Sequence, residues 1–182
     1  EYLLSQKFSS VIGYTGKVSK DDFRDPYYFP SDNIGRLGIE AQYETDLRGE
    51  HGNIFFTSDT SSDSDKEPVV GKNVILNIDR DIQEHLYDSL RDVLLESNLS
   101  RAAAIIQNPK NGEVLGLISF PTYDNNIFGS QISELDFSRL FNSKLRPLFN
   151  RIISGQYNPG STIKPFIGLT ALQEKTITPE DT

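Results

Sequence analysis

A serine and a lysine lie three residues apart in Ser161-Thr162-Ile163-Lys164, directly after the turn-forming pair Pro159-Gly160. Apolar residues continue at helical spacing, so we expect Ser161 at a helix start, with both side chains on one face. A serine hydroxyl is a weak nucleophile, and a lysine amine is a suitable base where desolvation or a nearby cation lowers its pKa. Free N–H groups at a helix start also favour an oxyanion. The pattern therefore fits acyl transfer through a serine ester.

By itself the S-x-x-K tetrapeptide is a weak signal, because ordinary residue frequencies produce it about once in a chain of this length. A simpler interpretation is that Ser161 caps the helix and Lys164 is a solvated residue in its first turn. The residues around the pair distinguish between the two interpretations.

The surrounding sequence closely resembles the active-site segment of the penicillin-binding proteins. That family has the pattern N-R-x-x-x-G-x-Y-x-P-G-S-T-x-K-P, and residues 150–165 read N-R-I-I-S-G-Q-Y-N-P-G-S-T-I-K-P. Three earlier segments also resemble family patterns, in family order: V-I-L-N-I-D-R-D-I-Q at 74–83, A-I-I-Q-N-P-K-N-G-E-V-L at 104–115 and F-P-T-Y-D-N-N at 120–126. Together these matches make the resemblance specific.

A fifth match, at residues 35–49, resembles G-x-x-G-l-E-x-x-Y-x-x-x-L-R-G, a motif of the non-catalytic pedestal domain in class B members. We expect Arg36, Glu40 and Arg48 to form a structural ion pair at the domain junction. Asp124 and Asn126 are expected to organise a turn beside the active site. The resemblance thus implies a set of structural residues: Gly35, Gly38, Glu40, Arg48, Gly49 and Asp124.

The resemblance also implies a function, that of a peptidoglycan D,D-transpeptidase. Ser161 would attack the carbonyl of a D-Ala-D-Ala stem peptide, Lys164 would assist proton transfer, and the amine of a second stem peptide would resolve the acyl-enzyme. β-Lactam antibiotics would acylate the same serine. The resemblance further implies a glycosyltransferase partner, and a bacterial cell-membrane protein whose catalytic domain is periplasmic and whose anchor lies outside this chain.

Two further family motifs, S-x-N and K-T-G, are expected C-terminal to the serine, and neither follows Ser161 here. Ser31-Asp32-Asn33 spells S-D-N before the nucleophile, and Lys175-Thr176 continues with Ile177; we interpret both as chance. Substrate-binding residues are therefore not assigned. We expect this chain alone to be catalytically inactive.

Composition excludes several other classes. The net charge of -8 and the lack of a basic patch argue against nucleic acid. The chain has no cysteine and only two histidines, so we expect neither a metal site nor a cofactor. No stretch reaches the roughly 18 apolar residues of a membrane helix.

The pattern of elements predicts an α+β fold in two parts. Residues 1–71 would be the C-terminal part of a pedestal (dimerisation) domain, and residues 72–182 the N-terminal part of a transpeptidase domain with helices on an antiparallel sheet. Strands are expected at 11–16, 54–57, 73–78, 102–107 and 114–119, with a hairpin turn at Asn111-Gly112. Helices are expected at 39–47, from Asp79 onward, at 132–142 and after Ser161, and a polar loop at 58–68.

Two other functions remain open. A non-catalytic penicillin-binding sensor or scaffold would also keep S-x-x-K, so Ser161 does not distinguish it from an enzyme. A serine β-lactamase fits less well, because those enzymes lack a pedestal. The lifetime of the acyl-enzyme separates the alternatives, since it is short for a hydrolase and long for a transpeptidase target or a receptor.

Overall fold

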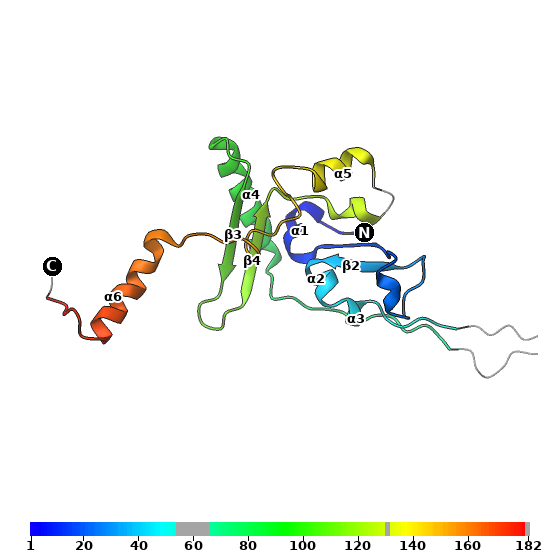
Figure 1. Cartoon of the computed structure of the whole chain (residues 1–182), viewed down its shortest axis with the longest axis horizontal. Helices are drawn as coiled ribbons and strands as arrows, with labels where there is room; N and C mark the ends of the chain where they lie inside the picture. Colours follow the sequence, from blue (N-terminus) through cyan, green and yellow to red (C-terminus); the bar gives the residue numbers. More distant parts are fainter. Residues whose placement is uncertain (54–65, 130–131, 181–182) are drawn as a thin grey trace, which may run out of the picture.

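The computed structural model describes residues 1–53, 66–129 and 132–180, and Figure 1 shows their arrangement. The N-terminal elements (blue to cyan) form one end of the body, and helix α4 with the β3–β4 hairpin forms its middle. Helix α6 stands apart at the other end, at the tip of a long segment. Helices and antiparallel strands are mixed along the chain, which confirms the predicted α+β class.

The N-terminal part is built on a short two-stranded sheet. Helix α1 (Ser5–Ile12) leads into β1 (Tyr14–Lys17), which pairs antiparallel with β2 (Asn33–Leu37) across a loop that contains the 3-10 helix η1 (Asp22–Arg24). Two short helices follow, α2 (Gly38–Gln42) and α3 (Glu44–Leu47). The helical turns expected at 39–47 are therefore confirmed.

The two glycines of the G-x-x-G motif are explained by close backbone approach. Gly38 has φ 63°, a left-handed conformation that favours glycine, and a Cβ there would lie 2.6 Å from the Gly13 nitrogen. A Cβ on Gly35 would lie 2.0 Å from the Glu40 carbonyl oxygen. Any side chain at either position would force α1, β2 and α2 apart.

The middle of the molecule is a helix packed on a hairpin. Helix α4 (Arg80–Glu96) begins after Asp79, whose side chain accepts a hydrogen bond from the Ile82 N–H, as predicted. Strands β3 (Ala102–Gln107) and β4 (Val114–Phe120) pair antiparallel, and Gly112 in the turn has φ 80°. Their shared core consists of Tyr87, Leu94, Ile118 and Phe120. This part was predicted correctly because its signals are local.

The chain then crosses back toward the N-terminal part before it reaches the S-x-x-K segment. It forms η2 (Asn125–Gly129) and α5 (Glu134–Phe141), and later η3 (Gly160–Ile163) and α6 (Lys164–Gln173). A second core cluster of Tyr14, Tyr123 and Leu140 joins β1 to this region. Tyr14 stacks on Phe128 with ring centroids 3.5 Å apart. The helix expected at 132–142 is confirmed.

The strand predicted at 73–78 is wrong, and the strand predicted at 11–16 is correct only from Tyr14 onward. Residues 73–78 pair with no strand within the described part of the chain, and the Ile75 side chain is 93% exposed. The apolar run there lacks a neighbour that could complete a ladder. Val11 and Ile12 belong to α1, and the strand begins at Tyr14 instead. Helical packing against β4 has overridden the β propensity of these residues.

The predicted strand at 54–57 and most of the predicted loop at 58–68 lie outside the described residues. Where the description resumes, Lys66 bridges to Asn53 and Val69 to Glu50, both antiparallel. Among the described residues, no helix is both long and apolar enough to cross a membrane.

Candidate active site and its support

The predicted nucleophile lies in a tight turn immediately before α6. Ser161 belongs to η3, and its carbonyl oxygen accepts a hydrogen bond from the Lys164 N–H, at the first residue of α6. Thr162 closes the turn, because its Oγ1 donates to the Pro159 carbonyl oxygen over 2.5 Å. In a 3-10 turn, side chains three residues apart eclipse each other. The local fold therefore places the Ser161 and Lys164 side chains one above the other, as the spacing predicted.

The Ser161–Lys164 pair is exposed to solvent. Both residues are exposed, and neither side chain makes a hydrogen bond or an ion pair with the part of the chain that the structure describes. A lysine acts as a general base when burial or a neighbouring cation destabilises its charge. This structure thus positions the two groups on one turn and provides no burial around them.

Helix α6 is apolar around its circumference and is almost entirely exposed. Phe166 is 66% exposed, Ile167 59% and Leu169 65%, and no residue of the helix is buried. Ile163, Phe166, Ile167, Thr170 and Ala171 lie on one helical face, and Leu169 and Leu172 extend the apolar surface beyond it. A helix that is apolar on every side is typical of the interior of a larger domain.

The segment that leads to Ser161 starts from a firm anchor at Asn150. The Asn150 Nδ2 donates to the Ser10 carbonyl oxygen over 2.9 Å. Its Oδ1 accepts from the backbone N–H groups of Ile152 (3.1 Å) and Ile153 (3.3 Å). The same amide thus caps the next turn and contacts α1. Only the N-R letters of the family pattern drew attention to this residue in the sequence.

Arg151 anchors the same segment from within. It is 6% exposed, and its guanidinium donates to the carbonyl oxygens of Leu145, Arg146 (3.3 Å) and Phe149 (3.2 Å). Its backbone N–H donates to the Ser119 hydroxyl over 3.0 Å. Burial lowers the pKa of Arg151. The side chain therefore holds the preceding loop together and turns away from solvent.

Asp124 and Asn126 form a turn, as predicted, and its place beside the active site stays a prediction. The Asp124 Oδ1 accepts from the Asn126 N–H over 2.9 Å. The Asn126 amide in turn bonds both backbone groups of Tyr2, at 2.7 Å and 3.0 Å. This turn is therefore bonded to the start of the chain. It contributes to the junction between the N-terminal part and the rest of the chain.

The prediction of an ion pair among Arg36, Glu40 and Arg48 is wrong. Arg36 bonds Asp22 at 2.6 Å and 3.0 Å, and the pKa of Asp22 is lowered, mainly by this pairing. Arg48 pairs with Asp25 at 2.9 Å. Glu40 is in no ion pair within the described residues, and burial raises its pKa. The loop between β1 and β2, which contains Asp22 and Asp25, satisfies both arginines.

The S-D-N sequence at residues 31–33 belongs to a small polar cluster of the N-terminal part. Asp32, within the S-D-N sequence of the N-terminal part, accepts a hydrogen bond from the Phe29 N–H over 2.8 Å and lies 3.1 Å from the His51 Nε2. These contacts organise a local turn. Over the described part of the chain, no group of three or more His, Cys, Asp or Glu residues is arranged to hold a metal ion.

Comparison with known protein families matches both parts of the chain. The Penicillin-binding Protein dimerisation domain matches residues 1–76, and the Penicillin binding protein transpeptidase domain matches residues 102–182. The peptidoglycan D,D-transpeptidase MrdA of Salmonella typhimurium is 34% identical over 194 aligned residues, and that of Haemophilus influenzae is 34% identical over 198. The alignments cover 100% of this chain but 30% and 29% of those two relatives.

Solved structures agree with this assignment. Pseudomonas aeruginosa PBP2, in complex with WCK 5153, matches with a TM-score of 0.81 and 34% identity, covering 100% of this chain and 36% of that one. Helicobacter pylori PBP2, in complex with MreC, matches with a TM-score of 0.80 and 29% identity, covering 100% and 34%. The chain therefore belongs to the class B penicillin-binding proteins, and it spans part of a dimerisation domain and part of a transpeptidase domain.

Proposed function

We propose that the protein containing this chain is a peptidoglycan D,D-transpeptidase, with Ser161 as its acyl-enzyme nucleophile and Lys164 as the group that assists proton transfer. The carrying observation is the η3–α6 junction, where the two residues lie one turn apart at the start of an apolar helix. The relatives named as D,D-transpeptidases align over the whole of this chain, including that junction.

The proposed reaction begins with attack of the Ser161 oxygen on the penultimate D-Ala carbonyl carbon of a stem peptide. The serine proton passes toward Lys164, and the terminal D-Ala leaves with a proton on its amine. The amine of a second stem peptide then attacks the ester, which forms the cross-link and returns the proton to the serine. A β-lactam would enter the first step and stop there, because its leaving group stays attached.

The exposure of the candidate site also supports a proposal about how fast this chain reacts with penicillin. Ser161 and Lys164 are solvated, α6 has no packing partner in the described part of the chain, and no S-x-N or K-T-G follows the serine in this sequence. We therefore expect the 182-residue chain to react with penicillin far more slowly than the full-length protein.

The experiment is intact-mass analysis of the full-length protein after incubation with a penicillin, with Ser161→Ala as its control. A stable adduct of one drug mass that is absent from the Ser161→Ala protein is the expected result. A folded full-length protein without an adduct would contradict the proposal. A stem-peptide donor then separates an enzyme from a receptor, because only the enzyme transfers the acyl group to an amine.

Three companion proposals rest on the family. The first domain would end near Gly71, the catalytic domain would face the periplasm from a membrane anchor, and a glycosyltransferase would act beside it. The MreC complex belongs to the Helicobacter pylori relative, and it supports a cell-wall assembly as the setting. Co-purification of the full-length protein with a membrane glycosyltransferase tests the last of these.

A further inference from the structure

The backbone of helix α1 is bonded along much of its length by side chains from distant parts of the chain. A backbone carbonyl oxygen has two lone pairs, so it can accept from a side chain even where it also has a backbone partner, and oxygens near a helix C-terminus often lack one. Here four backbone oxygens in and just after α1 accept from side chains that follow residue 80. These bonds are Gln83 to Lys7 (2.7 Å), Tyr123 to Ser9 (3.1 Å), Asn150 to Ser10 (2.9 Å) and Asn125 to Gly13 (2.9 Å).

Among these four side chains, Asn150 is the one at the start of the segment that leads to Ser161. Ser10 is also bonded at a second point, because its Oγ accepts from the Ser119 N–H at 3.1 Å. The Ser119 Oγ in turn accepts from the Arg151 N–H at 3.0 Å. Three hydrogen bonds and the Asn150–Arg151 peptide bond thus close a ring through Ser10 and Ser119 that connects α1, β4 and the catalytic segment.

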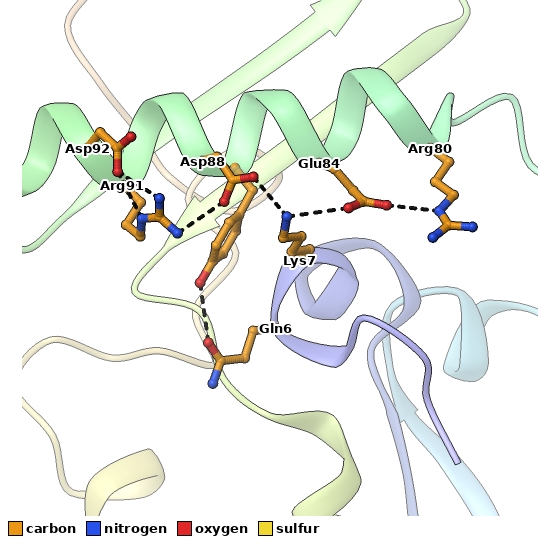
Figure 2. Close-up of polar contacts among 8 residues, drawn as sticks. Gln6, Lys7, Arg80, Glu84, Asp88, Arg91 and Asp92 are labelled. Atoms are coloured by element: carbon orange, nitrogen blue, oxygen red, sulfur yellow. Dashed lines mark hydrogen bonds and ion pairs between the residues drawn. The ribbon is translucent and has the colours of Figure 1, made fainter.

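Helix α1 is itself held from the side by α4. The Lys7 ammonium lies 2.9 Å from Asp88 and 3.4 Å from Glu84, on successive turns of α4, as Figure 2 shows. The Gln6 side chain accepts a hydrogen bond from the Tyr87 hydroxyl at 3.2 Å. The Ser10 carbonyl is therefore held in place, and its hydrogen bond to Asn150 fixes the start of the segment that follows Asn150.

We propose that Asn150 is a positioning residue for the acyl-transfer reaction, tying the path of the catalytic segment to helix α1 of the dimerisation domain. This inference rests on the proposed function of Ser161. Beyond Arg151 the segment makes few contacts, so its direction toward η3 is set at the anchor. Loss of the Asn150 Nδ2 donor leaves the nucleophile chemically intact but allows its segment to move relative to the rest of the domain.

The test uses the full-length protein and a matched pair of asparagines. Asn150 and Asn125 each donate one 2.9 Å hydrogen bond to a backbone oxygen of the N-terminal part, but only Asn150 precedes the catalytic segment directly. We expect Asn150→Ala to lower the first-order rate of acylation by a fluorescent penicillin about tenfold or more, since small misplacements of reacting groups are costly. Asn125→Ala is expected to lower Tm comparably and to acylate within about twofold of wild type.

Two further variants separate the interactions of Asn150. Asn150→Asp keeps an oxygen to accept from Ile152 and Ile153 but removes the donor to Ser10, so it should be as slow as Asn150→Ala. A wild-type rate in Asn150→Asp would show that only the local turn matters and would overturn the link to α1. Ser119→Ala removes one buried oxygen from the ring and should also slow acylation while remaining folded.

Failure of this inference is distinguishable from failure of the proposed function. If wild-type protein is not labelled at Ser161, the function itself is wrong. If wild type is labelled and the Asn150 variants lose Tm but acylate at the wild-type rate, Asn150 is only structural. Should Asn150→Ala fail to fold, a wild-type acylation rate in Ser119→Ala overturns the inference.

Discussion

The α1 junction, where Gln83, Tyr123, Asn125 and Asn150 bond backbone oxygens in and just after α1, differs from helix α6 in burial and in hydrogen bonding. At the junction, buried polar groups such as Gln83 and Asn125 are 0% exposed and bond backbone atoms that lie far away in the sequence. In α6, large apolar side chains are exposed, and the side chains of Lys164 at its start and Ser161 in the preceding η3 turn have no partner among the described residues. The region with the clearest motif is thus the region with the least tertiary support.

This difference shows that chemistry and position come from separate places in the chain. In the proposed reaction the S-x-x-K turn supplies the reactive groups, and the hydrogen bonds around Ser10 supply a fixed starting point for the segment that leads to them. Variants that change only one of these two regions measure how strongly the regions are coupled.

The largest expected effect in the 182-residue chain comes from truncation of a buried side chain in the α4–β4 core that borders α1, compared with truncation of an apolar side chain in α6. Ile118 is 0% exposed beneath α4, so Ile118→Ala should lower the free energy of unfolding by about 3 kcal/mol through lost burial and a cavity. Leu169 is 65% exposed, so Leu169→Ala should change it by less than about 0.5 kcal/mol. Urea denaturation measures both. Equal losses would mean that α6 is packed in solution and that the contrast is wrong.

Removal of Gln83 should be the next largest effect. Its amide donates to the Lys7 and Leu117 carbonyl oxygens and accepts from the Leu117 N–H at 2.8 Å. Gln83→Ala leaves these buried groups unpaired and should cost about 2 kcal/mol in thermal or chemical unfolding. Gln107→Ala is the matched control, because its one bond to Gly112 is exposed and should be worth less than about 0.5 kcal/mol. A similar cost for both variants would show that the junction is not specially stabilised.

The Arg36–Asp22 pair should give a smaller, pH-dependent effect. The pKa of Asp22 is lowered by Arg36 and by hydrogen bonds from Ser19, so the pairing stabilises the fold fully above the ordinary Asp pKa of 3.8 and less as pH falls below it. Asp22→Asn should lower stability by about 1 kcal/mol at pH 7. The difference from wild type should shrink in unfolding measurements below pH 4. A constant difference across that range would exclude the ionised carboxylate as its cause.

The smallest expected effect concerns the ion pairs between α1 and α4. The pKa of Lys7 is raised mainly by its hydrogen bond to Asp88, with a further contribution from Glu84, but all three groups are partly solvated. Lys7→Met should lower Tm slightly at low ionic strength, and the difference should disappear near 1 M salt because exposed charges are screened. Arg24→Met, which breaks an exposed pair with Asp21, should have no measurable effect. A salt-independent loss in Lys7→Met would point to packing instead.

Some features followed from the sequence alone because their signals are short-range. The helix that follows Asp79, the Asp79 cap and the Asn111-Gly112 turn each depend on residues a few positions apart, and all three were predicted correctly. The catalytic assignment also came from a contiguous pattern, since Ser161 and Lys164 share one turn. It remains a proposal.

Tertiary structure alone decided how the parts meet. The partners of Arg36 and Arg48 depend on where the β1–β2 loop folds back, and the missing strand at 73–78 depends on the lack of a neighbour among the described residues. Ser10 and Asn150 are 140 positions apart, and no local pattern relates a backbone carbonyl to so distant an amide. A local motif identifies the candidate reactive groups, whereas long-range hydrogen bonds, which no short stretch of sequence reveals, anchor the segment that leads to them.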